Sequence, residues 1–202
     1  MKLYYAPGAC SLAQHIVIRE GNLPVELIKV TFGPERKTQD GRDYYSVNPM
    51  GAVPALELDD GNVLTENAVL LQFLASLKPE ANLEPHAKGI DHWRYLETLN
   101  FIATELHKGF SPLFSNPPEE FAAKLKDKLG NRFDLLVQRL GANDYLAGNQ
   151  FSAADAYAFT ILTWAPKFGL DLARWPKLKA YFDRVKARPG VAQALQDEGL
   201  SV

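Results

Sequence analysis

The hydrophobic pattern changes character about eighty residues into the chain. Before that point, short alternating runs that suit strands are interrupted by two longer runs with helical spacing. The order β-α-β followed by β-β-α predicts a small mixed sheet with helices packed on it. The alternating runs are residues 2–6, 25–30, 53–58 and 63–65, and the helical runs are residues 11–21 and 66–77.

Glycine and proline mark the ends of these elements. Pro7-Gly8 ends the first strand, Gly21 ends the first helix, and Asp60-Gly61 predicts a hairpin turn in which glycine supplies positive φ. Residues 31–46 are polar and predict a loop with room for one short helix. The fold expected for residues 1–79 is therefore an α/β domain of thioredoxin-like type.

The remainder of the chain shows no convincing strand. Residues 80–86 are expected to be a linker, and residues 87–111 carry helical spacing. Residues 87–202 as a whole are predicted to form an all-α domain. Further helices are expected to open at Pro118, Pro176 and Pro189, because proline favours the first turn of a helix.

A capping-box pattern strengthens this prediction. Ser152 and Asp155 have the spacing with which a side chain at each position satisfies a backbone N–H of the other. They precede an apolar run that continues through Trp164. We expect a buried helix to begin at this point.

Composition restricts the classes of function. The net charge of −2 offers no electrostatic footprint for nucleic acid, and no stretch reaches the ~20 apolar residues that span a membrane. A single cysteine cannot form an internal disulfide, so an oxidising compartment is not required. The expectation is a cytoplasmic protein without nucleic-acid or membrane partners.

That single cysteine, Cys10, stands where the first strand gives way to the first helix. Unpaired backbone N–H groups and the helix dipole at such a position favour a thiolate. The alternative is an inert, buried cysteine. Ser11 can donate a hydrogen bond to a bound thiolate or simply cap the helix.

Val53-Pro54 opens an inner strand, where proline is unusual because it cannot donate to the sheet. We predict a cis peptide bond here, which would leave the N–H and C=O of Val53 facing outward and unpaired, so that an extended peptide could pair with them. An ordinary edge-strand proline is the alternative.

Glu66 and Asn67 lie where the fourth strand ends and the second helix starts. Backbone amides at a helix start suit a carboxylate, and the Glu66 side chain suits an ammonium group. A ligand with both groups on one carbon, next to a peptide and a thiol, is γ-glutamyl-cysteinyl-glycine, which is glutathione. A capping residue followed by an ordinary first turn is the alternative.

The expected long helix carries a polar stripe. At 100° per residue, Asn100, Thr104, His107 and Ser111 fall within about 60° of one another, away from the apolar stripe. His107 is thus a candidate for the site or a structural histidine. His15, His86 and His92 are expected to be structural or exposed, and Tyr4 and Tyr5 are expected to pack within the first strand.

Four segments together resemble the cytosolic glutathione transferases. They are PGACSLA, VNPMGAVPAL, LTEN and YLAGNQFSAADAY, and their order matches that family along essentially the whole chain. The Cys10-Ser11 pair, taken with the segment ATELHKGF, is most similar to the bacterial beta class.

The resemblance implies roles for individual residues. Cys10 contacts the glutathione sulfur, with Ser11 and His107 as further catalytic candidates, and the Val53-Pro54 backbone pairs with the cysteinyl part. Glu66 and Asn67 hold the glutamyl end, and either Arg36 or Lys37 holds the glycyl carboxylate. The resemblance also places Asn100, Thr104, Glu105 and His107 beside glutathione.

The implied activity is conjugation of the glutathione thiol to small hydrophobic electrophiles by a homodimer, with no metal and no cofactor besides glutathione as co-substrate. Glu105 is the candidate for a residue that reaches a partner subunit's site. The electrophile pocket is expected from residues 6–9, residues 110–114 and the helix around Trp164. Three alternatives remain: thiol–disulfide or peroxidase chemistry through a Cys10 mixed disulfide, a non-enzymatic carrier, and a regulatory protein.

Overall fold

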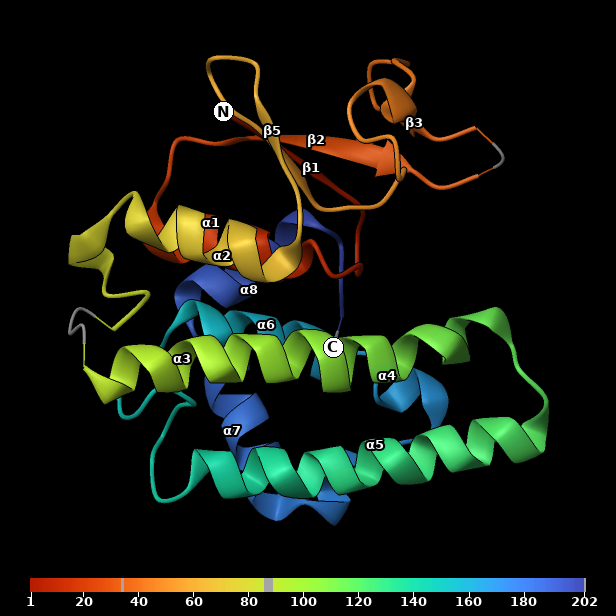
Figure 1. Cartoon of the computed structure of the whole chain (residues 1–202), viewed down its shortest axis with the longest axis vertical. Helices are drawn as coiled ribbons and strands as arrows, with labels where there is room; N and C mark the ends of the chain where they lie inside the picture. The colour runs from red at the N-terminus through yellow and green to blue at the C-terminus, as the bar shows by residue number, and fades with distance from the viewer. Residues whose placement is uncertain (34, 86–88, 202) are drawn as a thin grey trace. The chain divides into compact units, whose positions relative to one another are not determined.

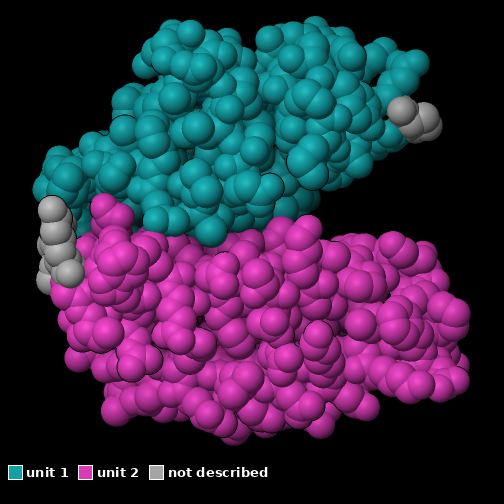
Figure 2. Space-filling view, viewed as in Figure 1, with its two compact units in different colours: residues 1–83, 189–202 teal, residues 84–188 magenta. Residues whose placement is uncertain are grey.

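The chain forms two compact units, which are coloured separately in Figure 2. This computed structural model describes residues 1–33, 35–85 and 89–201. Unit 1 comprises residues 1–83 and 189–202, and unit 2 comprises residues 84–188. His86, the end of the expected linker and the expected helix start at residue 87 lie outside the described residues.

Unit 1 contains a five-stranded sheet with the order β3-β2-β1-β4-β5. β1 pairs with β2 in parallel, and the other neighbours are antiparallel. The four predicted strands are confirmed, and the short edge strand β3 is an addition within the expected polar loop. The strands are β1 (Lys2–Tyr5), β2 (Glu26–Thr31), β3 (Lys37–Thr38), β4 (Ala55–Glu57) and β5 (Val63–Leu64).

Three helices complete unit 1: α1 (Leu12–Gly21), α2 (Asn67–Ser76) and α8 (Pro189–Asp197). α1 and α2 pack side by side beneath the sheet, and α8 packs against α1 (Figure 1). The predicted hairpin turn is present, with Gly61 at φ +85°. Single 3₁₀ turns span Tyr44–Ser46 and Pro79–Ala81.

The place of α8 differs from the expected helical region 87–202. Its buried residues, Val191, Ala194 and Leu195, lie on the side that packs on α1. Glu198, just beyond the helix, bonds to His15 of α1 across 183 positions of sequence. Contacts between residues this far apart leave no local pattern in the sequence. For this reason the sequence assigns α8 to the helical region that precedes it and not to unit 1.

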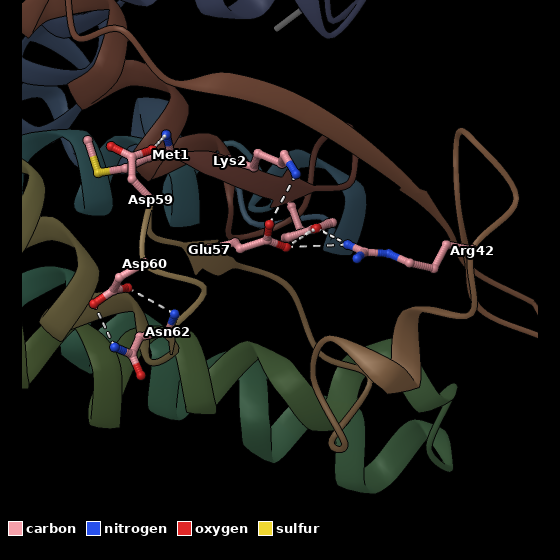
Figure 3. A network of polar contacts seen from close by, with 8 residues as sticks. Met1, Lys2, Arg42, Glu57, Asp59, Asp60 and Asn62 are labelled. Atoms are coloured by element: carbon pink, nitrogen blue, oxygen red, sulfur yellow. Dashed lines mark hydrogen bonds and ion pairs between the residues drawn. The ribbon is translucent and has the colours of Figure 1, made fainter.

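A polar network joins the strands at one side of the sheet (Figure 3). Glu57 on β4 accepts hydrogen bonds from Lys2 at 3.0 Å and from the Tyr4 hydroxyl at 2.6 Å, and Arg42 also bonds that hydroxyl. Tyr4 is fully buried, and burial together with the Glu57 hydrogen bond raises its pKa to about 12. This confirms Tyr4 as a packing residue.

Among the described residues of unit 2, the regular elements are helices, joined by loops and turns. Its α-helices are α3 (Ile90–Phe101), α4 (Lys108–Phe110), α5 (Glu119–Leu140), α6 (Ala153–Leu162) and α7 (Pro176–Lys186). Its 3₁₀ turns are Ser111–Ser115, Pro166–Phe168 and Leu172–Arg174. In the described part of the chain, no helix has the length and apolar character needed to cross a membrane.

The expected long helix is present, but it is not regular. A π-helical segment, Ile102–His107, joins α3 to α4. Such wide turns occur mostly as single insertions and are frequent at functional sites. The 100° step used to align the polar stripe therefore does not hold between residues 102 and 107.

The predicted capping box is confirmed at the start of α6. The Ser152 N–H donates to Asp155 at 2.8 Å, and the same fully buried carboxylate accepts from the Leu146 N–H at 2.8 Å and the Tyr181 hydroxyl at 3.0 Å. The box thus anchors three segments of unit 2 around the start of a helix whose residues are all buried.

Candidate functional site

Cys10 occupies the turn that leads into α1, and it is a half-buried cysteine that is in no disulfide. Its Sγ lies 3.2 Å from the backbone carbonyl oxygen of Val53. The thiol donates to this carbonyl, so the hydrogen bond requires the proton on sulfur and opposes the effect of the helix start. The expectation that the Val53 carbonyl would be unpaired is therefore wrong.

Ser11 points into the turn before α1, toward the backbone of Ala6. It is fully buried, and its hydroxyl bonds to the backbone of Ala6, accepting from the N–H at 3.1 Å and donating to the carbonyl at 3.3 Å. The hydroxyl thus acts both as a donor and as an acceptor within the turn between β1 and α1. Ser11 fixes the loop that carries Cys10 and leaves no O–H for a ligand's sulfur.

The predicted cis peptide bond between Val53 and Pro54 is confirmed. In the part of the chain that the structure describes, the Val53 N–H takes part in no backbone hydrogen bond of a turn, loop or cap. The preceding carbonyl, that of Ala52, accepts from the Tyr44 hydroxyl at 2.8 Å and from the Asn48 amide at 2.7 Å. These buried groups hold the approach to Val53 in one position.

Glu66 has a backbone conformation that is rare for a residue with a side chain. It stands at the N-cap of α2 with φ 71° and ψ 117°, and its side chain caps no helix N–H. Its carbonyl accepts from the N–H groups of Val69 and Leu70. Positive φ at a non-glycine residue costs about 1–3 kcal/mol and clusters at ligand sites. Glu66 is exposed and stands directly before the first residues of α2, at the predicted junction between strand and helix.

Gln14, which the sequence reading missed, links α1 to this helix start. Its side-chain amide donates to the Asn67 carbonyl at 3.1 Å, although both residues are buried. Among the described residues, the side-chain oxygens of Gln14 and Asn67 have no hydrogen-bond partner. Buried acceptors without a donor are expensive. The sequence feature that could have pointed to Gln14 is a single glutamine on an otherwise apolar face of the first helix.

Arg36 and Lys37 separate into two environments. The guanidinium of Arg36 donates to the Gly51 carbonyl and stacks 4.7 Å from the centre of the Phe32 ring. Lys37 is exposed and forms an ion pair with Glu35 at 2.8 Å. The structure thus brings Arg36, and not the Lys37 ammonium, to the segment that leads to Val53.

His107 belongs to unit 2, where its Nδ1 lies 2.7 Å from the Tyr157 hydroxyl. Burial, with a smaller effect of the nearby Lys108 charge, lowers its pKa to about 4. The ring is therefore neutral at pH 7. A neutral imidazole has one acceptor nitrogen and one N–H, so Tyr157 can donate to Nδ1 and leave the Nε2–H as a donor.

The other predicted residues of unit 2 lie in or next to the π-helical segment. Asn100 and Thr104 are exposed, and the Thr104 hydroxyl donates to the Asn100 carbonyl at 3.0 Å. Glu105 forms an ion pair with Arg132 of α5 at 2.6 Å. Its carboxylate already has a cationic partner within its own chain.

An aromatic cluster surrounds His107 in unit 2. The Trp164 ring lies 5.3 Å from the His107 ring and 5.1 Å from that of Phe114, which is 43% exposed. Phe168 packs on Phe114 at 4.9 Å, and Phe110 is buried beneath them. Several of the residues expected to shape an electrophile pocket thus form one continuous apolar cluster, and Phe114 is its exposed edge. Across the described ranges, no group of histidine, cysteine, aspartate and glutamate side chains could hold a metal ion.

Family models match both parts of the chain. The glutathione S-transferase N-terminal domain model covers residues 9–77, and the C-terminal domain model covers residues 101–189. Glutathione S-transferase GstA of Escherichia coli O157:H7 is 42% identical over 201 residues, which is 99% of this chain and 100% of that protein.

Solved structures agree with this result. A sphingomonad glutathione S-transferase complexed with glutathione is 42% identical, with a TM-score of 0.93 and full coverage of both chains. A bacterial beta-class enzyme from Sphingomonas chungbukensis is 40% identical, with the same TM-score and coverage. The chain therefore belongs to the glutathione S-transferase family, among its bacterial beta-class relatives.

Proposed function

We propose that this protein is a glutathione transferase that joins the glutathione sulfur to an electrophilic carbon of a small hydrophobic compound. The observation that carries this proposal is the full-length similarity to a transferase solved with glutathione. In the reaction, the glutathione S–H loses its proton, the sulfur forms a bond to carbon, and a leaving group departs or a double bond is saturated. The protein contributes proximity and stabilisation of the sulfur anion.

Unit 1 holds glutathione in this proposal. The glutamyl carboxylate meets the first amides of α2 at Glu66 and Asn67, and the glutamyl ammonium meets the Glu66 side chain. The cysteinyl part pairs with the Val53-Pro54 backbone, which places its sulfur by Cys10. Arg36 is the better choice for the glycyl carboxylate, because Lys37 is already paired with Glu35.

Unit 2 supplies donors and an apolar surface. Asn100, Thr104 and the neutral His107 are assigned to the glutathione sulfur and its surroundings, and the aromatic cluster to the electrophile. The low pKa of His107 supports a role as a neutral donor, since a cationic imidazole is not populated at pH 7. Glu105 is assigned a supporting role through Arg132.

The test combines binding and catalysis. Retention on immobilised glutathione and conjugation of 1-chloro-2,4-dinitrobenzene, followed at its product absorbance, are the expected results. Activity is also expected to survive metal chelation and extensive dialysis, since only glutathione is required as co-substrate. Retention without conjugation across a panel of aryl halides, epoxides and enones would support a carrier or a regulatory protein instead. Failure to bind glutathione would reject the assignment.

Cys10 supports a second activity. The Cys10 sulfur lies 3.2 Å from the Val53 carbonyl, so it would meet the sulfur of a peptide paired with that residue. Cys10 can attack the glutathione sulfur of a mixed disulfide between glutathione and a small thiol, form a disulfide with that glutathione and release the small thiol. A second glutathione then regenerates Cys10 and leaves as oxidised glutathione. Because the chain has one cysteine, this exchange is monothiol.

We also assign a homodimer and a cytoplasmic location. Members of this family usually form two-fold dimers, and a lone cysteine that reacts with glutathione suits a reducing compartment. Light scattering of the purified protein tests the first assignment, with a monomer as the contradicting result. Cell fractionation tests the second.

A further inference from the structure

A buried carboxylate near the end of the chain reaches the loop that carries Cys10. Glu198 Oε2 accepts from the Gly8 N–H at 2.9 Å, and Glu198 Oε1 bonds to His15 Nδ1 at 2.9 Å. The side chains of Glu198 and His15 are both completely buried. All three residues belong to unit 1, so these distances lie within one compact body.

The position of this carboxylate is costly on general grounds. Glu198 directly follows α8, and its own N–H still bonds to the carbonyl of Ala194. The C-terminal end of a helix carries partial negative charge, which disfavours an acid there. The oxygens of a buried carboxylate must also find hydrogen-bond partners. The Gly8 N–H and His15 Nδ1 are those partners, so the carboxylate is tied to them.

The loop from Ala6 to Ser11 is held from three directions. Ser11 bonds to both backbone groups of Ala6, the Ala9 N–H donates to the Ala6 carbonyl, and Glu198 holds Gly8. Gly8 has φ 71°, and an added Cβ would lie 3.5 Å from Leu200. Glu198 ties the middle of the loop to the end of α8, and the hydrogen bond from Cys10 to the Val53 carbonyl ties its far end to the segment before β4. Glu198 thereby helps to set where Cys10, two residues after Gly8, lies against Val53.

We propose that Glu198 is a positioning residue for Cys10, with His15 orienting the carboxylate from α1. Cys10 touches the reacting atoms, whereas Glu198 acts through the Gly8 backbone. The expected effect of Glu198 on turnover rests on the proposed function. The effect of Glu198 on the reactivity of the Cys10 thiol can be measured without glutathione.

The neighbouring acid offers a matched control. Asp197 lies next to Glu198 in sequence but is directed to Arg19, whose Nε donates to it at 2.8 Å, and to His15 Nε2 at 3.3 Å. Among the described residues, Asp197 has no hydrogen bond or ion pair with the loop from Ala6 to Ser11. Asp197→Asn therefore removes a charge from the same helix end without releasing Gly8. The other titratable group that faces His15 is Tyr5, with its ring centre 5.7 Å from that of His15.

The experiment compares Glu198→Gln, Glu198→Ala and Asp197→Asn at pH 7. Cys10 is titrated with dithiobis(2-nitrobenzoate), whose disulfide it attacks while one nitrothiobenzoate anion leaves. We expect Glu198→Gln to change this rate at least fivefold and Glu198→Ala to change it further. Asp197→Asn should stay within twofold of the parent. Protection of the Gly8 amide from hydrogen exchange should fall only in the Glu198 variants.

Turnover provides the second readout. In glutathione-dependent exchange with a small disulfide, kcat should fall at least fivefold in Glu198→Gln, while the KM for glutathione stays within twofold because Glu66, Asn67 and Val53 are untouched. If Glu198→Ala does not fold, the near-isosteric glutamine variant carries the test.

Two results would overturn the inference. One is an unchanged thiol rate in folded Glu198→Gln, which would make Glu198 a stabilising contact only. The other is an equal change in Asp197→Asn, which would indicate a general effect of the helix end. If the protein binds no glutathione at all, the proposed function fails, but the thiol titration still decides the position of Cys10.

Discussion

The two units arrange their polar groups by different means. In unit 1, the groups assigned to glutathione are largely backbone atoms at places where one element ends and another begins, as at Val53 and Glu66. In unit 2, they are side chains on a helix, His107 above all, set among aromatic rings. The first kind of site depends on local chain geometry, and the second depends on packing around an irregular helix.

Because of this difference, mutations test the two groups of residues in different ways. Only a substitution to proline removes a backbone N–H, so other substitutions near Val53 or Gly51 act by moving the chain. Gly51, at φ 62°, illustrates the constraint, because an added Cβ would lie 2.6 Å from the Tyr45 ring. A side chain such as His107 can be replaced singly, so its protonation and hydrogen bonding are open to direct test.

Cys10→Ala should give the largest effect, because it removes the one reactive side chain from a site otherwise built of backbone groups. Monothiol exchange should fall at least about 100-fold, since no other cysteine can replace it. Conjugation to an aryl halide should fall by less than about tenfold, since the backbone groups and unit 2 donors remain. Parallel assays of the two reactions measure the split.

Mass spectrometry sharpens this prediction. Oxidised glutathione should add one glutathione to the parent protein, reversibly with reductant, and none to Cys10→Ala. Equal loss of both activities without an adduct in the parent would mean that Cys10 serves conjugation alone.

The sequence was most informative in unit 1, for a physical reason. Strand ends, the Asp60-Gly61 turn and the start of α2 are set by neighbouring residues, so patterns predicted both the elements and the placing of Glu66 and Asn67. The polar loop hid β3, because a strand of two residues has no detectable period. The inward turn of Ser11 was also hidden, since its partner Ala6 became visible only in the folded loop.

Prediction failed more broadly where distant residues meet. A regular step of 100° could not anticipate the π-helical segment before His107, nor its contact with Tyr157 fifty positions away. The pairing of His15 with Glu198 likewise joins the two ends of the chain. The expectation that His15 is structural or exposed holds in its first form, because His15 is fully buried in that pair, but the partner Glu198 was not foreseen.

Glu66→Gln tests the electrostatic part of the unit 1 site while keeping side-chain size. Loss of a charged hydrogen bond to the glutamyl ammonium should weaken glutathione binding by about 1–3 kcal/mol, or about 5- to 150-fold. Titration calorimetry measures the change, with Glu26→Gln, an exposed acid on β2, as the control. An unchanged dissociation constant would remove Glu66 from the glutamyl site.

In unit 2, the pH dependence of the free energy of unfolding tests whether His107 is buried as a neutral imidazole. Burial lowers the pKa of the folded state from 6.5 to about 4, so the unfolded state binds the proton more readily. Stability is therefore complete above about pH 6.5 and is lost as pH falls toward 4. Between pH 7 and pH 5, the parent should lose about 2 kcal/mol of unfolding free energy that His107→Gln does not lose.

Urea unfolding of both proteins at the two pH values measures this difference, and His92→Gln serves as the histidine control. A parent and His107→Gln with the same pH dependence would mean that His107 is accessible to protons in the folded state. The buried, neutral donor assigned to unit 2 would then be untenable.

The smallest expected effect concerns the choice between Arg36 and Lys37. Arg36 bonds to the Gly51 carbonyl, two residues before Val53, whereas Lys37 is exposed and paired with Glu35. Exposed ion pairs contribute little, so Lys37→Met should change glutathione affinity less than about twofold, and Arg36→Met should weaken it about 5- to 10-fold.

Glutathione amidated at its glycyl carboxylate shows whether Arg36 binds that carboxylate or only supports the fold around Gly51. The parent should bind this analogue about as weakly as Arg36→Met binds glutathione, and Arg36→Met should show no further loss, as expected for two changes to one interaction. A larger loss in Lys37→Met would transfer the role to Lys37. Equal loss of both ligands in Arg36→Met would mean that Arg36 only supports the Gly51 turn.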